Sequence, residues 1–170
     1  MAELTPKDAL QPSLLDRLSD DEPGRGVESR RDRVMDTAQL REAVLRDLSW
    51  LLNTNSRGSF DDVDGLTEVT RSVYNYGTPD LCGVNASYVK GTQSRIEASI
   101  RDAIRVFEPR VLQSGLSIRV LNQPGRHGPT SVILEIEGEI WGQVVPDRLY
   151  LRTEIDLDTG ETALRGGRRG

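Results

Sequence analysis

The sequence predicts an α+β fold in which two main helices pack on a small antiparallel sheet, a C-terminal meander. Apolar residues recur at helical spacing in two segments, at about 36–52 and 92–108. Three later segments alternate apolar and polar residues with the period of a strand. Turn-forming residues separate these three segments, so we expect neighbouring strands to pair in an antiparallel way.

The first helix is expected to begin at Asp36 or Thr37 and to end at about Leu52. One face is apolar and the opposite face is charged, as in a helix that packs on a core. The polar run at 53–58 supplies the stop. Trp50 is interpreted as a core or rim anchor rather than a ligand platform. The apolar face consists of Leu40, Val44, Leu48 and Leu51.

The second helix is expected from about Thr92 to Glu108. Pro109 disfavours helical geometry at the residue before it, which places Glu108 at the C-terminal end. Between the two helices the pattern is irregular, and 69–76 fits either a short strand or a helical turn. The apolar stripe of the second helix consists of Ile96, Ile100, Ala103, Ile104 and Phe107.

The expected strands are Leu116–Leu121, Ser131–Trp141 and Asp147–Asp158. The third has the clearest alternation, because every second residue is apolar or Thr. Its members are Leu149, Leu151, Thr153, Ile155 and Leu157.

A chain of 170 residues predicts one domain with a real core. We expect a polar N-terminal extension at 1–35, the α+β domain at 36–160 and a flexible C-terminal tail at 161–170. The extension is expected to be disordered or loosely docked. Its apolar patch has helical spacing and is a candidate for a docked helical turn, at Leu14, Leu15 and Leu18.

The composition argues against several classes of protein. A net charge of -5 disfavours a nucleic-acid binder, which needs clustered Lys and Arg for phosphate contacts. Cys82 is the single cysteine, so no internal disulfide can form, and the cytoplasm is the expected compartment. The first ten residues lack the apolar core of a secretion signal, and no stretch has the length of a membrane-spanning helix. We therefore expect no direct membrane insertion.

The sequence favours a protein without catalytic residues, metal or cofactor. His127 is the only histidine and lies in a Gly/Pro loop without metal-ligand spacing or a nucleophile. Glu135, Glu137 and Glu139 alternate along one strand, and a muramidase-like hydrolase needs two carboxylates. A polar outer sheet face explains the same alternation better. The hydrolase remains an alternative, as does a soluble regulatory adaptor.

Several short segments follow one another along the chain, namely Pro12–Leu18 with 20–23, Leu40–Arg41, Arg46–Leu48 with Trp50–Thr54, Val73–Gly77 with Pro79–Leu81, and Phe107–Arg110. In this order they resemble the TssE subunits of type VI secretion baseplates, a branch of the phage baseplate wedge family often called lysozyme-like. The resemblance implies a structural cytoplasmic protein at the baseplate, on the cytoplasmic side of the inner membrane. It implies TssF and TssG as wedge partners, with TssK and the contractile sheath proteins as further candidates.

The resemblance implies that Glu108, Pro109 and Arg110 are the family signature and contact other wedge subunits. Pro109 fixes the exit from the helix, so Glu108 and Arg110 are expected to project from a rigid corner towards charged groups of a partner. The alternative is an internal ion pair that closes the corner.

The resemblance also implies a contact with the sheath, because proteins of this family look like the attachment part of sheath subunits, which interlock by sharing strands. An extended segment can add to an open sheet edge. The candidate sheath edge is the last expected strand, through Leu151, Thr153, Ile155 and Leu157. The alternative is that Glu154, Asp156 and Asp158 are edge charges that prevent pairing.

Overall fold

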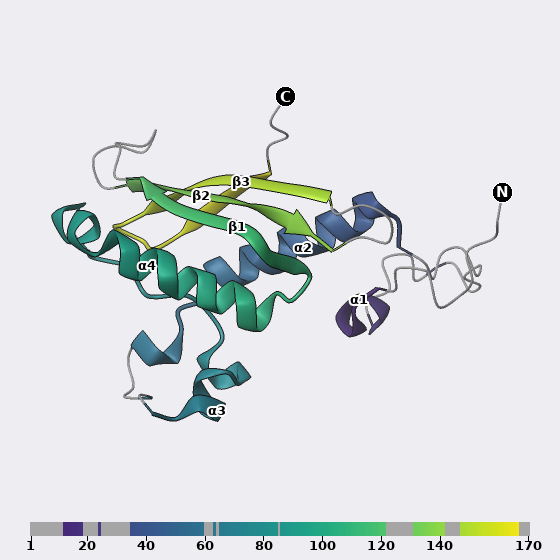
Figure 1. Cartoon of the computed structure of the whole chain (residues 1–170), viewed down its shortest axis with the longest axis horizontal. Coiled ribbons are helices and arrows are strands. Elements are labelled where there is room, and N and C mark those ends of the chain that lie inside the picture. Colours follow the sequence, from purple (N-terminus) through teal and green to yellow (C-terminus); the bar gives the residue numbers. More distant parts are fainter. Residues whose placement is uncertain are drawn as a thin grey trace.

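The computed structural model describes residues 12–18, 24, 35–59, 63, 65–84, 86–121, 131–141 and 147–166. Two layers make up the fold, a four-stranded antiparallel sheet and the two long helices that cover one of its faces (Figure 1). The predicted α+β class is therefore confirmed. Most of the predicted extension, the end of the predicted tail and His127 lie outside the described residues.

The first main helix, α2 (Thr37–Leu52), has the predicted bounds. It begins with a capping box in which Asp36 accepts from the backbone N–H of Gln39, and the Gln39 side chain accepts from the backbone N–H of Asp36. The predicted apolar face is buried. Trp50 is 48% exposed and so belongs to the rim of the helix rather than to the core.

The second main helix, α4 (Ala86–Phe107), begins six residues before the predicted start and ends where Pro109 requires. The backbone N–H of Glu108 still bonds Ile104 O at 2.9 Å, which closes the last turn. Shorter helices are α1 (Leu14–Leu18), α3 (Thr67–Thr70) and the 3-10 turns η1 (Arg57–Ser59) and η2 (Val73–Asn75). The helical-turn interpretation therefore holds for 14–18 and for the 69–76 segment.

The sheet has the order β1-β2-β3-β4, with β1 (Val111–Leu121), β2 (Ser131–Ile140), β3 (Asp147–Asp156) and β4 (Thr162–Gly166). The three predicted strands are confirmed. The first begins five residues earlier than predicted, because a register shift between Leu112 and Ser117 interrupts its alternation. Gly115 lies in this irregular stretch with a φ of 88°.

The fourth strand was not predicted, and it corrects the candidate sheath edge. β4 pairs along β3, so Leu151, Thr153 and Ile155 lie opposite Gly166, Leu164 and Thr162. The prediction that β3 offers a free edge through these residues is wrong, and Leu157 lies in the turn that follows it. The predicted tail accordingly contains a strand at 162–166.

The turn between β3 and β4 explains the error. Asp156 Oδ1 accepts from the backbone N–H groups of Asp158 and Thr159, and Gly160 takes a φ of 77°. These local contacts reverse the chain immediately after β3. The glycine-rich, basic sequence that follows lacks a clear strand pattern, so the hairpin is not visible in the apolar periodicity.

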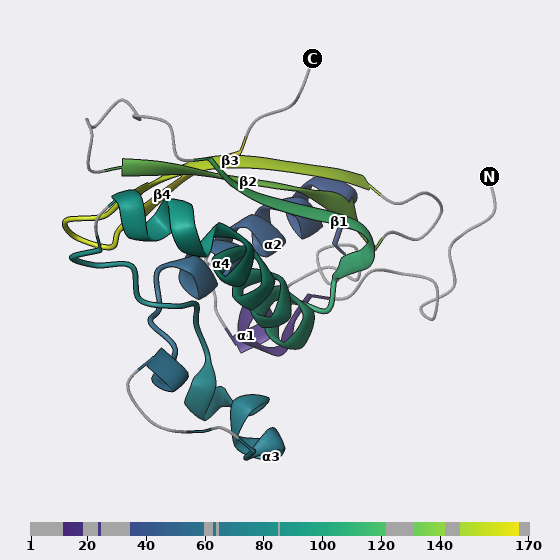
Figure 2. The ribbon, with the colours of Figure 1, turned by 60° about the vertical axis from the view of Figure 1, so that its left-hand side comes forward.

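Figure 2 shows the two long helices along one face of the sheet. Buried apolar residues of these helices and of the strands form one core cluster. α4 packs mainly against β1, and α2 packs against β4. Within the described residues, no helix is long and apolar enough to cross a membrane. Residues that are at most 2% exposed include Leu48, Ile104, Leu134, Ile136 and Leu151.

Side chains cap both edges of the sheet. At β1, Glu97 Oε1 accepts from the backbone N–H of Val120 at 2.9 Å, and Gln93 Nε2 donates to Val120 O. At β4, the amide group of Asn53 bonds the backbone N–H and C=O of Thr162 at 2.8 and 3.0 Å. Each cap occupies backbone groups that another strand would otherwise use.

Candidate functional site

The corner between α4 and β1 is built around a buried ion pair. Glu108 is 2% exposed, and the guanidinium of Arg110 holds both of its carboxylate oxygens. Arg110 Nε donates to Oε1 at 2.7 Å and Nη2 donates to Oε2 at 2.5 Å, which is the bidentate geometry that makes arginine–carboxylate pairs strong. Pro109 is exposed between them. The prediction that Glu108 projects outward is wrong, because its side chain points inward to meet Arg110.

A chain of ion pairs extends from this corner to α1. Arg110 Nη2 also donates to Asp47 Oδ2 on α2 at 2.5 Å. The other oxygen of Asp47 binds Arg46, whose Nε donates at 2.9 Å. Arg46 Nη1 then donates to Asp16 Oδ1 on α1 at 2.6 Å. Five charged residues thus connect the α4–β1 corner, α2 and α1.

Two aromatic side chains pack beside the same network. Phe107 and Tyr76 form an edge-to-face pair with ring centroids 5.2 Å apart. Burial raises the pKa of Tyr76, and the negative charges of Asp47 and Glu108 raise it further. The loop that carries Tyr76 is held close to the end of α2, because Gly77 approaches Thr54 so closely that a Cβ atom would lie 2.3 Å from Thr54 O.

The charges of the network stabilise one another. Burial alone would lower the pKa of Arg110, but the hydrogen bonds to Glu108 and Asp47 outweigh it and raise this pKa. Burial alone would raise the pKa of Asp16, but the bonds from Arg46 and Ser13 bring this pKa below its usual value. The contribution of Asp16 to stability is therefore present at neutral pH and is lost as the pH falls through its lowered folded-state pKa.

Exposed apolar side chains surround the network. Trp141 is 54% exposed and lies next to the corner, since its backbone N–H bonds Arg110 O at 2.8 Å. On α2, the Arg46 guanidinium lies 5.0 Å from the ring centroid of Trp50. Trp, Tyr and Arg are the residue types that carry most binding energy in protein interfaces. The site has the composition of a protein–protein contact.

The carboxylates of the hydrolase alternative lie elsewhere, on the sheet face that the helices do not cover. Glu135 lies 3.5 Å from Arg152, and Glu137 lies 3.8 Å from Arg119 on the neighbouring strand. These are cross-strand ion pairs of a polar sheet face. Among the described residues no cluster of His, Cys, Asp or Glu has the arrangement of a metal site.

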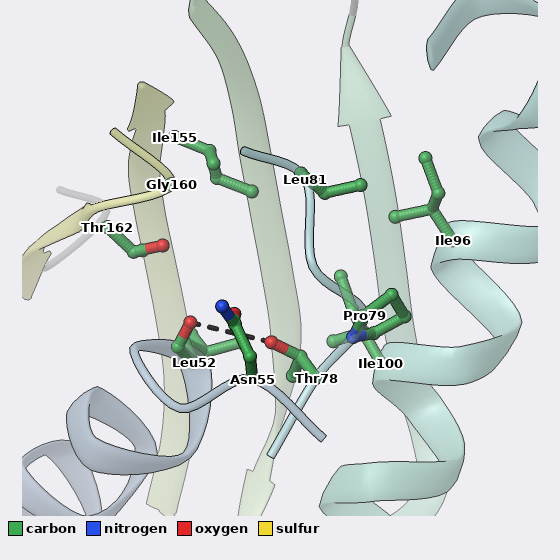
Figure 3. Close-up of a pocket in the computed structure, with 10 residues that line it drawn as sticks. All are labelled: Leu52, Asn55, Thr78, Pro79, Leu81, Ile96, Ile100, Ile155, Gly160 and Thr162. Carbon is green, nitrogen blue, oxygen red and sulfur yellow. Dashed lines mark hydrogen bonds between the residues drawn. The ribbon is translucent and has the colours of Figure 1, made fainter. Parts of the chain in front are cut away.

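A small hollow lies where the end of α2, the 78–81 loop, α4 and the β3–β4 turn meet (Figure 3). Its volume is about 10 Å³, which is roughly enough for one water molecule. Apolar side chains such as Leu81, Ile100 and Ile155 line much of it. The hollow is too small to hold a metabolite or a sugar.

Comparison with known proteins decides the family. The family model described as "Baseplate wedge protein gp25" matches residues 38–144, well over half of the chain. This chain belongs to the gp25 family of baseplate wedge proteins. By family it is a baseplate component, and the family is a structural one.

Two solved structures are among those that match the chain. A chain of "The baseplate complex from the type VI secretion system" is 18% identical and has a TM-score of 0.43, with 68% of this chain and 93% of that chain covered. A candidate tail lysozyme from Geobacter sulfurreducens is 15% identical and has a TM-score of 0.42, with 81% of this chain and 98% of that chain covered. No curated protein matches the chain.

The gp25 match contains most of the network but not all of it. Arg46, Asp47, Tyr76 and the Glu108–Arg110 corner lie inside the matched range, whereas Asp16 lies before it. Of this network, the sequence predicted only the corner. The other residues of the network lie within the segments that carry the family resemblance, but no local pattern indicated that these segments meet in space.

The ion pair generates a stability prediction. We expect Arg110→Ala to lower the free energy of unfolding by about 3 kcal/mol, because it leaves the Glu108 carboxylate buried and unpaired. Urea unfolding followed by circular dichroism measures this change. Arg105→Ala is the matched control, since Arg105 is exposed and its partner among the described residues is Asp102 on the same helix, and its loss should cost less than about 1 kcal/mol. Equal effects of the two substitutions would contradict the structural role of the pair.

Proposed function

We propose that this gp25-family protein is the TssE-type wedge subunit of a type VI secretion baseplate. It joins TssF and TssG through the Glu108–Pro109–Arg110 corner and helps to start the contractile sheath, with TssK as a further neighbour. It acts without catalysis, on the cytoplasmic side of the inner membrane.

The observation that carries the proposal is the meeting of the resemblance segments at one place. Asp16, Arg46 with Asp47, Tyr76, and the corner come from segments that are far apart along the chain. Together they form a single network beside the exposed side chains of Trp50 and Trp141. Stability alone would not require such a network, because apolar residues stabilise a fold at least as well as a buried ion pair does.

The corner offers a rigid surface for binding. Pro109 limits the backbone, and Arg110 is fixed by two carboxylates while its side chain stays 24% exposed. Among the described residues, the Nη1 group of Arg110 has no hydrogen-bond partner. A carbonyl or carboxylate of TssF or TssG can accept from this group, and Trp141 beside it can bury apolar area. Glu108 then acts through Arg110 and does not touch the partner.

Binding to the purified TssF–TssG pair tests this function. We expect the wild-type chain to bind and Trp141→Ala to bind about tenfold more weakly or worse, since an exposed tryptophan next to Arg110 has the character of an interface anchor. Calorimetric titration measures the affinity, and circular dichroism checks that the variant is folded.

The matched control is Val73→Ala, which removes apolar area at a side chain that is 86% exposed on η2. This variant should bind like the wild type. If the wild-type chain does not bind the pair at all, the wedge function fails, and the regulatory adaptor becomes the better hypothesis.

The sheath contact is proposed at β4 in place of β3. Strand addition needs backbone groups that point out of the sheet. The backbone N–H and C=O of Thr162 point out of the sheet, but the Asn53 side chain already bonds both. Because backbone direction alternates along a strand, Leu164 is the next residue whose N–H and C=O face away from β3. The β1 edge is a weaker candidate, since α4 side chains cap it and its register is irregular.

The β4 edge generates a specific prediction. Leu164→Pro removes one outward N–H without removing a bond to β3, so sheath nucleation should fall while binding to TssF–TssG stays unchanged. Leu164→Val keeps the N–H and is the control. Counting sheaths by fluorescence microscopy in cells that carry each variant measures the effect. Normal sheath numbers with Leu164→Pro would exclude strand addition at this edge.

A further inference from the structure

The short helix α1 is locally well defined in spite of its length. Ser13 Oγ accepts from the backbone N–H of Asp16 at 3.3 Å, and Asp16 Oδ2 accepts from the backbone N–H of Ser13 at 3.2 Å. This is a reciprocal capping box that fixes the first turn. A helix of five residues is nevertheless too short to be stable alone, so it depends on contacts with other surfaces.

The polar and apolar residues of α1 lie on opposite sides of the helix. With about 100° between successive residues, Leu14, Leu15 and Leu18 lie within an arc of about 100°, and Asp16 lies about 150° from the centre of that arc. Asp16 is the residue that binds Arg46 on α2. The anchor to the domain is therefore on the opposite side of the helix from the three leucines.

The leucine face is exposed as a result. Leu14 is 74% exposed, Leu15 48% and Leu18 76%, and α1 contains no buried residue. These three side chains contribute nothing to the core of the domain. An ion pair holds the helix, and its apolar face is presented to the outside.

A chain of ion pairs connects this leucine face to the candidate binding site. Arg46, which holds α1, also binds Asp47, and Asp47 binds Arg110 at the corner. Arg46 further lies over Trp50, which is itself half exposed. The same ion-pair chain that supports the corner thus sets the orientation of the leucines.

We propose that Leu14, Leu15 and Leu18 form a second docking surface, which enters an apolar groove on the same wedge partner that contacts the corner. This inference rests on the proposed wedge function. The partner surface is expected to be apolar, because Arg46 already binds the charged side of α1 at Asp16, and three of the four exposed residues of α1 are leucines, with Arg17 as the fourth. The ion pair with Arg46 pre-orients the helix and so reduces the entropy that binding must overcome.

The test compares two double variants of the full chain in titrations with the purified TssF–TssG pair. Leu14→Ser with Leu18→Ser should weaken binding about tenfold or more, while the unfolding midpoint in urea stays unchanged because both leucines are exposed. Leu66→Ser with Val73→Ser is the control, since it removes exposed apolar side chains of similar size from the α3–η2 segment and should leave binding unchanged.

A third variant tests the role of the anchor. Asp16→Asn keeps all three leucines but removes the charge that binds Arg46, so binding should weaken by a severalfold factor that is smaller than the effect of the leucine variant. An Asp16→Asn effect equal to or larger than that of the leucine variant would show that α1 acts through its charge and would overturn the docking proposal.

The remaining outcomes separate this proposal from the proposed function. If the wild-type chain binds and the leucine variant binds equally well, the α1 surface is wrong while the wedge function stands. If the wild-type chain does not bind, both fail. If sedimentation shows that the wild-type chain self-associates and that Leu14→Ser with Leu18→Ser abolishes this, the leucines cover a second copy of the chain, and the proposal is overturned.

Discussion

The buried ion pair between Glu108 and Arg110 is the contact on which the arrangement of this protein depends. Burying a carboxylate to 2% exposure costs free energy unless a cation binds it, and the Arg110 guanidinium binds Glu108 with two hydrogen bonds. Because the pair spans Pro109, it fixes the angle between α4 and β1. Asp47 joins the pair from α2, so the two long helices and the first strand share one polar anchor point.

Local sequence patterns predicted most of the fold, because apolar periodicity reports directly on which face of an element is buried. The faces of α2 and α4 and the three longest strands follow from it. β4 did not, since a hairpin set by Asp156 and Gly160 continues into a strand of five residues, which is too short to show a clear apolar pattern. A strand's place in a sheet depends on its neighbours, so missing β4 also made β3 look like an edge.

The candidate site was predictable only in part. Pro109 marks the corner in the sequence, but the direction of the Glu108 side chain depends on where Arg110 and Asp47 lie in space. Asp16 and Tyr76 belong to the site through partners that lie far away along the chain, which no local rule identifies. Membership of the gp25 family and the exposed tryptophans beside the network favour a site that binds proteins rather than one that performs chemistry.

The central claim is that the corner is the wedge contact. Site-specific photo-crosslinking in assembled baseplates tests it most directly. A photoreactive amino acid replaces Trp141 beside the corner in one sample and Val73 on η2 in another, since both positions are exposed. We expect crosslinks to TssF or TssG from position 141 and none from position 73. Crosslinks from position 73 alone would place the contact at η2 instead and would contradict the role of the corner.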